Sequence, residues 1–107
     1  MATTNYTIDR YSVFHNTLDT TNGLTAVINC FEGRTHRGTL YFYRDGFTAP
    51  PSQKIANGAL YLRFHEARFG EVIGTLRYEK PLSLTFNDAN NWGSILSGEE
   101  MIGEQEG

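Results

Sequence analysis

The stretch Thr39-Leu40-Tyr41-Phe42-Tyr43 decides the fold class, because hydroxyl-bearing side chains alternate in it with purely apolar ones. Side chains alternate between the two faces of a β-strand, so Leu40 and Phe42 share one face and Tyr41 and Tyr43 share the other. β-branched and aromatic residues favour strands. The stretch therefore predicts a strand whose aliphatic face lies in a core.

Turn signals on the N-terminal side of this strand predict two more strands before it. Glu32-Gly33-Arg34-Thr35 turns the chain, and the apolar run Leu24 to Glu32 precedes that turn. Asn22-Gly23 is a tight-hairpin signal, since this pair tolerates positive φ. A weakly alternating segment, Tyr6 to Leu18, comes before it. The simplest interpretation is a meander of three antiparallel strands.

The C-terminal side begins with a connection and then another strand. The connection runs from Phe47 to Asn57 and contains Pro50-Pro51, which cannot donate to a sheet ladder. Ala59 to Phe64 alternates again and predicts a fourth strand. Two further strands are expected at Leu82 to Phe86 and at Trp92 to Ser97, separated by a polar turn.

Between these strands the apolar period changes from two residues to that of a helix. Phe69, Val72, Ile73 and Leu76 fall at i, i+3, i+4 and i+7, which predicts an amphipathic helix that ends at Lys80-Pro81. Gly70 and Gly74 each cost about 1 kcal/mol of helix propensity. We expect these glycines to allow close packing on the protein's own sheet, or the approach of another backbone.

The element order is β-β-β-β-α-β-β, which predicts an α+β, mostly-β fold: a curved antiparallel sheet or small barrel of about six strands with one helix. A chain of 107 residues suits one domain, expected over residues 1–98 with an acidic tail over 99–107. The predicted core consists of Leu40, Phe42, Leu62, Phe64, Phe69, Val72, Ile73, Leu76, Leu84 and Phe86.

The last third of the chain carries a resemblance. Leu76-Arg77-Tyr78-Glu79-Lys80-Pro81-Leu82-Ser83-Leu84 and the acidic ending Glu99 to Glu106 resemble a group of short uncharacterised bacterial proteins with an L-R-x-E-K-P motif. Those proteins commonly carry proline where this chain has Met101. The resemblance implies a bacterial single-domain protein, and it brings no activity and no catalytic residues with it.

Charge and cysteine content indicate the cellular compartment in which the protein is expected. The chain has 12 acidic and 9 basic residues, for a net charge of -3. Four of the acids lie in the last nine residues, so the body holds 12 − 4 = 8 acids and is near neutral. Cys30 is the single cysteine and lies in an apolar run, where a small buried hydrophobe is expected. With no signal-like or membrane-spanning segment, we expect a cytoplasmic protein that does not enter a membrane.

Motifs for catalysis, metals and cofactors are missing from the sequence. His15, His36 and His65 have no ligand spacing between them, and there is no second cysteine for a zinc site. Nucleophile-elbow and phosphate-loop patterns are also missing. We therefore expect no metal and no cofactor, and we lean against an enzyme, although an enzyme of unrecognised type stays open.

The candidate binding residues are basic and aromatic side chains around the central strand: Arg34, His36, Arg37, Tyr41, Tyr43 and Arg63. Arginine suits carboxylate and phosphate, and aromatics beside arginine on a sheet can stack on single-stranded nucleic acid. The competing interpretation is that both faces of the strand are covered and the tyrosines pack ordinarily.

These observations favour a small non-enzymatic binding or protein-interaction module with an anionic ligand or protein partner. The alternative is an OB-like barrel for single-stranded nucleic acid, which the acidic net charge disfavours. A homodimer is a further expectation, since open sheet edges can pair. The acidic tail is expected either to be solvated or to fold over Arg34 and Arg37, or over Arg63 and Arg68.

Overall fold

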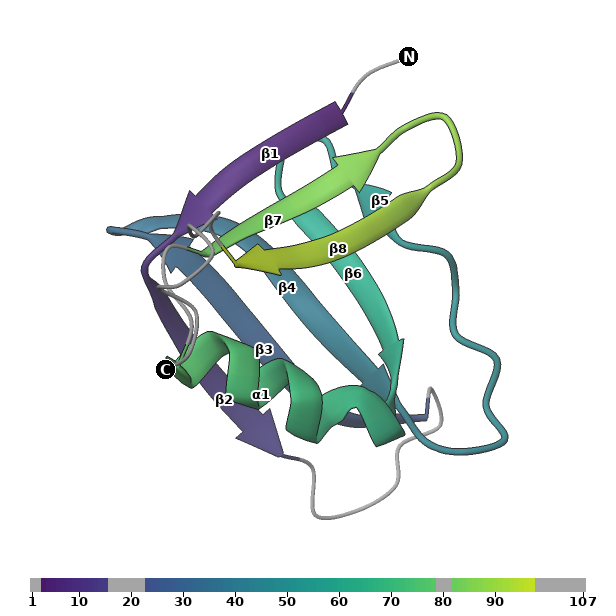
Figure 1. Ribbon diagram of the computed structural model, residues 1–107. Helices are drawn as coiled ribbons and strands as arrows, with labels where there is room; N and C mark the ends of the chain where they lie inside the picture. The colour runs from purple at the N-terminus through teal and green to yellow at the C-terminus, as the bar shows by residue number, and fades with distance from the viewer. Residues whose placement is uncertain (1–2, 16–22, 79–81, 98–107) are drawn as a thin grey trace, which may run out of the picture.

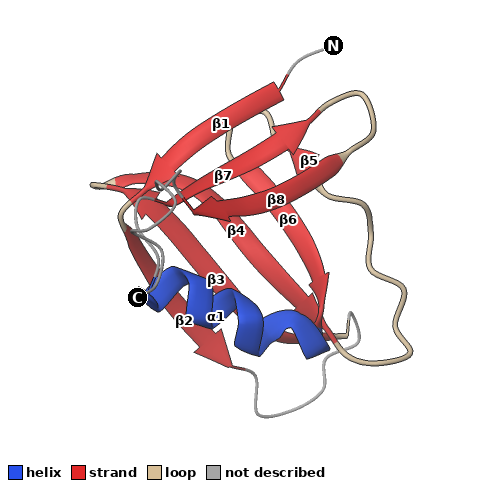
Figure 2. Ribbon diagram, viewed as in Figure 1, coloured by secondary structure: helices blue, strands red, loops and turns tan. Residues whose placement is uncertain are grey.

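The structure is a computed structural model, and it describes residues 3–15, 23–78 and 82–97. Two sheets and one helix make up this part of the chain (Figures 1 and 2). The large sheet has the strand order β2-β3-β4-β6-β5, with bounds Arg10–His15, Leu24–Glu32, Thr35–Tyr43, Leu60–His65 and Gln53–Lys54. The small sheet has the order β1-β7-β8, with bounds Thr3–Ile8, Leu82–Asn87 and Trp92–Ser97.

The predicted fold class is confirmed: the domain is mostly β with one helix, and its sheets are curved. The sheets do not close into a barrel. The meander β2-β3-β4 is antiparallel, as expected. The strand β6, however, runs parallel to β4 rather than antiparallel, after a long connection that also forms the short edge strand β5. A connection of this length lets the chain cross over and return in the same direction.

The predicted first strand is two strands in different sheets. At Asp9 the chain passes from β1 in the small sheet to β2 in the large one. The Asp9 N–H donates to the Phe31 carbonyl at 2.9 Å, and its carboxylate accepts the Gly33 N–H at 2.9 Å. The bend at Asp9 lets Ile8 on one side and Val13 on the other pack on the same core. Because the core-facing positions are even-numbered before the bend and odd-numbered after it, the alternation over the whole segment is weak.

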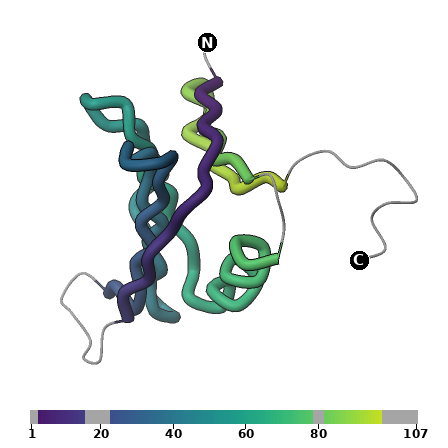
Figure 3. Tube along the Cα trace, turned by 90° about the vertical axis from the view of Figure 1, so that its left-hand side faces the viewer, coloured from purple at the N-terminus to yellow at the C-terminus, as the bar shows by residue number. Residues whose placement is uncertain are grey.

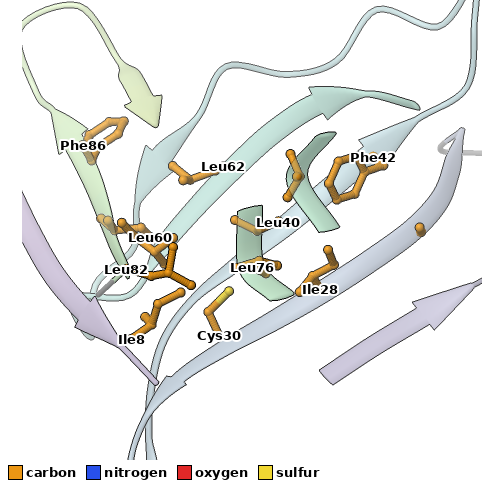
Figure 4. Close-up of a cluster of buried hydrophobic side chains, with 13 residues drawn as sticks. Ile8, Ile28, Cys30, Leu40, Phe42, Leu60, Leu62, Leu76, Leu82 and Phe86 are labelled. Carbon is orange, nitrogen blue, oxygen red and sulfur yellow. The ribbon is translucent and has the colours of Figure 1, made fainter. Parts of the chain in front are cut away.

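The large sheet forms one layer, and the small sheet and the helix lie together on a single face of it (Figure 3). The core lies between these layers (Figure 4). Seven predicted core residues are buried: Leu40, Phe42, Leu62, Val72, Leu76, Leu84 and Phe86. The other three, Phe64, Phe69 and Ile73, are partly buried and pack against that core.

Two glycines allow the small sheet to approach the large one closely. A Cβ on Gly38 of β4 would lie 2.6 Å from Leu84 Cδ1 and 2.8 Å from the Leu60 carbonyl oxygen. A Cβ on Gly93 of β8 would collide with Leu62. Side chains at these two positions would push the layers apart.

The helix begins where the sequence predicted the change of period. His65 caps a short 3₁₀ turn, Glu66–Arg68, by accepting the Ala67 N–H on its Nδ1 at 3.0 Å. The α-helix α1 follows over Phe69–Tyr78. Its predicted end at Lys80-Pro81 and the acidic tail over 99–107 lie outside the described residues.

Candidate functional site

The outer face of the large sheet is the face turned away from the small sheet and the helix. None of the described helices or strands covers it (Figure 3). Cross-strand pairing places Phe14, Val27, Tyr41 and Arg63 in one row across β2, β3, β4 and β6. Phe14 is 60% exposed, and the other three are partly exposed. This row runs across an open surface and includes two of the predicted binding residues, Tyr41 and Arg63.

Arg63 is the centre of a cluster with three tyrosines, called here the tyrosine–arginine cluster: Tyr41, Tyr43, Tyr61 and Arg63. The Arg63 guanidinium carbon lies 4.8 Å from the Tyr41 ring centroid and 5.6 Å from that of Tyr61. Arg63 Nη1 donates to the Tyr43 hydroxyl at 2.7 Å, and Nη2 lies 3.5 Å from Gln53 Oε1. The two rings therefore hold the cation through cation–π contacts.

The positive charge of Arg63 is not matched by an acid in the described structure. No ion pair joins Arg63 to a carboxylate among the described residues. A guanidinium carries five N–H donors, and those of Nη1 and Nη2 named above account for two of them. Its Nε is buried without a hydrogen-bond partner. The remaining Nη N–H groups can therefore donate to an external anion, most naturally a carboxylate or phosphate.

The tyrosines play different parts in the cluster. Tyr43 is buried, because Phe47 stacks on its ring with centroids 5.6 Å apart. Tyr41 and Tyr61 meet edge to face at 5.3 Å and remain partly exposed. Burial raises the pKa of the Tyr41 phenol, Tyr61 adds to the rise, and Arg63 opposes it. The Tyr41 phenol therefore stays neutral at physiological pH and leaves the positive charge of Arg63 unbalanced.

The structure divides the predicted site residues into two groups. Tyr41, Tyr43 and Arg63 come together in the cluster. His36 lies near the start of β4, with its Nε2 at 2.8 Å from Thr39 Oγ1. Arg37 lies at a bulge in β4, pairs with Glu32 at 3.0 Å and stacks over the Tyr6 ring at 4.6 Å. Arg34 is exposed at the turn between β3 and β4.

Two contributors to this surface, Tyr61 and Gln53, are not among the predicted site residues. Tyr61 stands two residues before Arg63 on β6, and so on the same face. This spacing was a usable signal for Tyr61. Gln53 reaches Arg63 only because β5 pairs with the outer edge of β6. No local pattern in the sequence indicated that pairing.

A second feature of the molecule is a cavity of about 540 Å³ that the sequence analysis did not anticipate. It lies where the bend between β1 and β2 meets the C-terminal end of α1 and the start of β7. The described residues that line it are Thr7, Ile8, Asp9, Arg10, Tyr11, Leu76, Arg77 and Leu82. These residues come from segments far apart in the chain, so only the fold brings them together.

Within the described residues, no three His, Cys, Asp or Glu side chains gather in a way that could hold a metal ion. In the described part of the chain, His65 has an acidic partner, since its Nε2 lies 3.2 Å from Asp45 Oδ1. Both side chains are largely exposed, and His65 also caps the 3₁₀ turn. This pair accordingly has a clear structural role.

Comparisons with known proteins add no identification. No protein-family model, no curated protein and no solved structure matches this chain. In the described part of the chain, no helix has the length and apolar character required to cross a bilayer.

Proposed function

We propose that this protein is a small, non-enzymatic interaction module. It binds an acidic segment of a protein partner on the outer face of the large sheet. The observation that carries the proposal is the tyrosine–arginine cluster, in which Arg63 lies over two tyrosine rings and has no carboxylate partner among the described residues. Tyrosine and arginine are the residue types that most often dominate the energy of protein interfaces.

The geometry supports a carboxylate on Arg63 and apolar contacts beside it. A carboxylate can accept from the Nη donors that face away from Tyr43, while Tyr41 and Tyr61 fix the guanidinium plane. Val27 and the exposed Phe14 continue the row and offer an apolar surface to the same partner. The expected ligand is therefore an acidic residue followed by apolar side chains.

A nucleic-acid ligand is less well supported by the same surface. Single-stranded nucleic acid needs several cations along its backbone and exposed rings for its bases. Among the candidates, Arg37 is paired with Glu32, and the ring of Tyr43 is covered by Phe47. The sheets also do not form the closed barrel that the OB-like alternative requires. Nucleic acid is therefore kept as an outcome of the test.

The test selects ligands from a random peptide library displayed on phage. We expect the selected peptides to contain Asp or Glu next to apolar residues. Arg63→Gln should weaken their binding about tenfold or more, the scale of one lost charge-assisted hydrogen bond. Arg34→Gln is the matched control, because Arg34 is exposed outside the cluster, and binding should not change. Thermal melting of both variants verifies that they are folded.

Two results would count against the proposal. One is that no acidic peptides are selected, or that those selected bind Arg63→Gln as tightly as the parent protein. The other is that labelled single-stranded oligonucleotides bind in fluorescence anisotropy, with a steep salt dependence and a loss in Arg63→Gln. The second result would establish the nucleic-acid alternative.

The proposal also includes the setting inferred from the sequence. We propose a bacterial, cytoplasmic protein, in keeping with a single buried thiol at Cys30. Self-association is part of the same proposal. The small sheet supports it, because its outer strand β8 contains no charged residue. Such edges are the usual sites of strand pairing between chains.

A further inference from the structure

We infer that the cavity between the β1–β2 bend and the end of α1 binds a small amphipathic carboxylate. Its alkyl body would lie on Ile8, Leu76 and Leu82, and its carboxylate would pair with Arg77. The cavity shares no residue with the tyrosine–arginine cluster, so this inference stands or falls independently of the proposed function.

The interior of the cavity is apolar. Ile8, Leu76 and Leu82 are each at most 6% exposed and belong to the hydrophobic core (Figure 4). Tyr11 packs against the same core and lines the cavity on the β2 side. A volume of about 540 Å³ lies within the range of pockets that hold small organic ligands. This lining favours an aliphatic body over a sugar or a nucleotide.

The charged residues at the rim determine the polar end of the ligand. The Asp9 carboxylate already accepts the Gly33 N–H at 2.9 Å. Arg10 donates to the Gly33 carbonyl at 3.2 Å and lies over the Phe31 ring. Two of the three charged side chains at the rim therefore already have partners within the protein.

Arg77 is the remaining charged residue at the rim. It lies in the last turn of α1, is exposed, and forms no hydrogen bond or ion pair with another described residue. The C-terminal end of a helix carries partial negative charge, which by itself repels anions. Binding of a carboxylate at this end of α1 therefore depends on Arg77, and the ligand is an anion rather than a neutral lipid.

The test titrates the full chain with hexanoate, octanoate and the neutral analogue octanamide, and follows the methyl groups of Ile8, Leu76 and Leu82 by NMR. Octanoate should shift these methyls saturably. Each added CH₂ should tighten binding about fourfold, because it buries more apolar surface. Octanamide should bind roughly tenfold more weakly than octanoate, since it lacks the charge that Arg77 recognises.

Variants separate the charge from the cavity. Arg77→Gln should weaken octanoate roughly tenfold and leave octanamide unchanged, and the octanamide titration also verifies that the variant is folded. Arg68→Gln, which removes an exposed charge at the opposite end of the helical segment from Arg77 and outside the cavity lining, should change neither. The inference is overturned if the three methyls do not respond to octanoate, or if Arg77→Gln binds it as tightly as the parent. It is also overturned if, without ligand, these methyls show nuclear Overhauser contacts to Met101 or Ile102, because the chain's own acidic segment would then fill the cavity.

Discussion

Arg63 is the charged centre of the candidate binding surface, where it contacts the Tyr41 ring and donates to the Tyr43 hydroxyl. The alternation within β4 placed Tyr41 and Tyr43 on one face, and the structure brings Arg63 onto both of them. Arg37 was predicted for the same site, but a bulge in β4 turns it toward Glu32 and Tyr6. A bulge shifts the alternation by one residue, and no turn residue in the sequence indicated this bulge.

Cys30 gives a prediction at the residue scale. It is fully buried, and desolvation raises its thiol pKa from 9.0 to about 12. In the unfolded chain the thiol ionises near its ordinary value, whereas in the fold it keeps its proton. The contribution of Cys30 to the free energy of unfolding is therefore complete below pH 9 and is lost as the pH rises toward 12. In that window the free energy of unfolding should fall by about 1.4 kcal/mol per pH unit through this group.

Urea unfolding at a series of values between about pH 8 and about pH 11 measures this slope. Cys30→Ala should be less stable at neutral pH and show a shallower decline. The decline that remains would include Tyr41, whose pKa is also raised. An equal slope in Cys30→Ala and in the parent protein would show that Cys30 does not contribute.

At the scale of elements, the helix was predicted well and its contacts less well. The apolar spacing correctly placed Val72 and Leu76 in the core. Phe69 and Ile73 lie at the border of the core, because the helix covers only part of the large sheet beside the small one. The parallel pairing of β4 and β6 could not be predicted, since it depends on the path of a long connection rather than on either strand.

The helix glycines provide the prediction at this scale. We expected Gly70 and Gly74 to allow close packing on the sheet, but a Cβ at either position would have no atom within 4 Å apart from its chain neighbours and the helix backbone. That expectation was wrong. Gly74→Ala should therefore raise the free energy of unfolding by about 0.5–1 kcal/mol, because alanine restricts the unfolded chain and favours the helix.

Gly38→Ala is the contrasting variant. Its Cβ would press on Leu84 and on the Leu60 backbone, and overpacking of this kind costs about 1–3 kcal/mol. Chemical denaturation of the two variants beside the parent protein compares the effects. A loss of stability in Gly74→Ala would mean that another backbone packs against α1, as in a dimer.

At the scale of the whole molecule, the fold separates a shielded edge from an open one. On the β1 side of the small sheet, Lys54 Nζ donates to Thr4 Oγ1 at 3.1 Å and brings a charge to that edge. On the other side, β8 has no charged residue, and Trp92 and Leu96 are 68% and 45% exposed. Uncharged, apolar edges of this kind favour pairing with a second chain.

We therefore expect self-association through β8, with a weight-average mass that rises with concentration in analytical ultracentrifugation. Leu96→Lys should shift the protein toward the monomer, because it introduces a charge at this edge. Phe14→Lys is the matched control, since Phe14 is similarly exposed on the edge strand β2 of the other sheet. A monomer at all concentrations would rule out the dimer, and an effect of Phe14→Lys alone would place the contact on β2.

The pairing of β1 with β7 also has a consequence for synthesis on the ribosome. Thr3 pairs with Asn87, so 87 − 3 = 84 residues must be added before that contact can form. At about 5–20 residues per second this takes roughly 4–17 s. During that time β2 can already pair with β3, but β1 has no strand beside it. Its composition suits this delay, because threonine and asparagine outnumber apolar residues in it and keep the nascent segment hydrated.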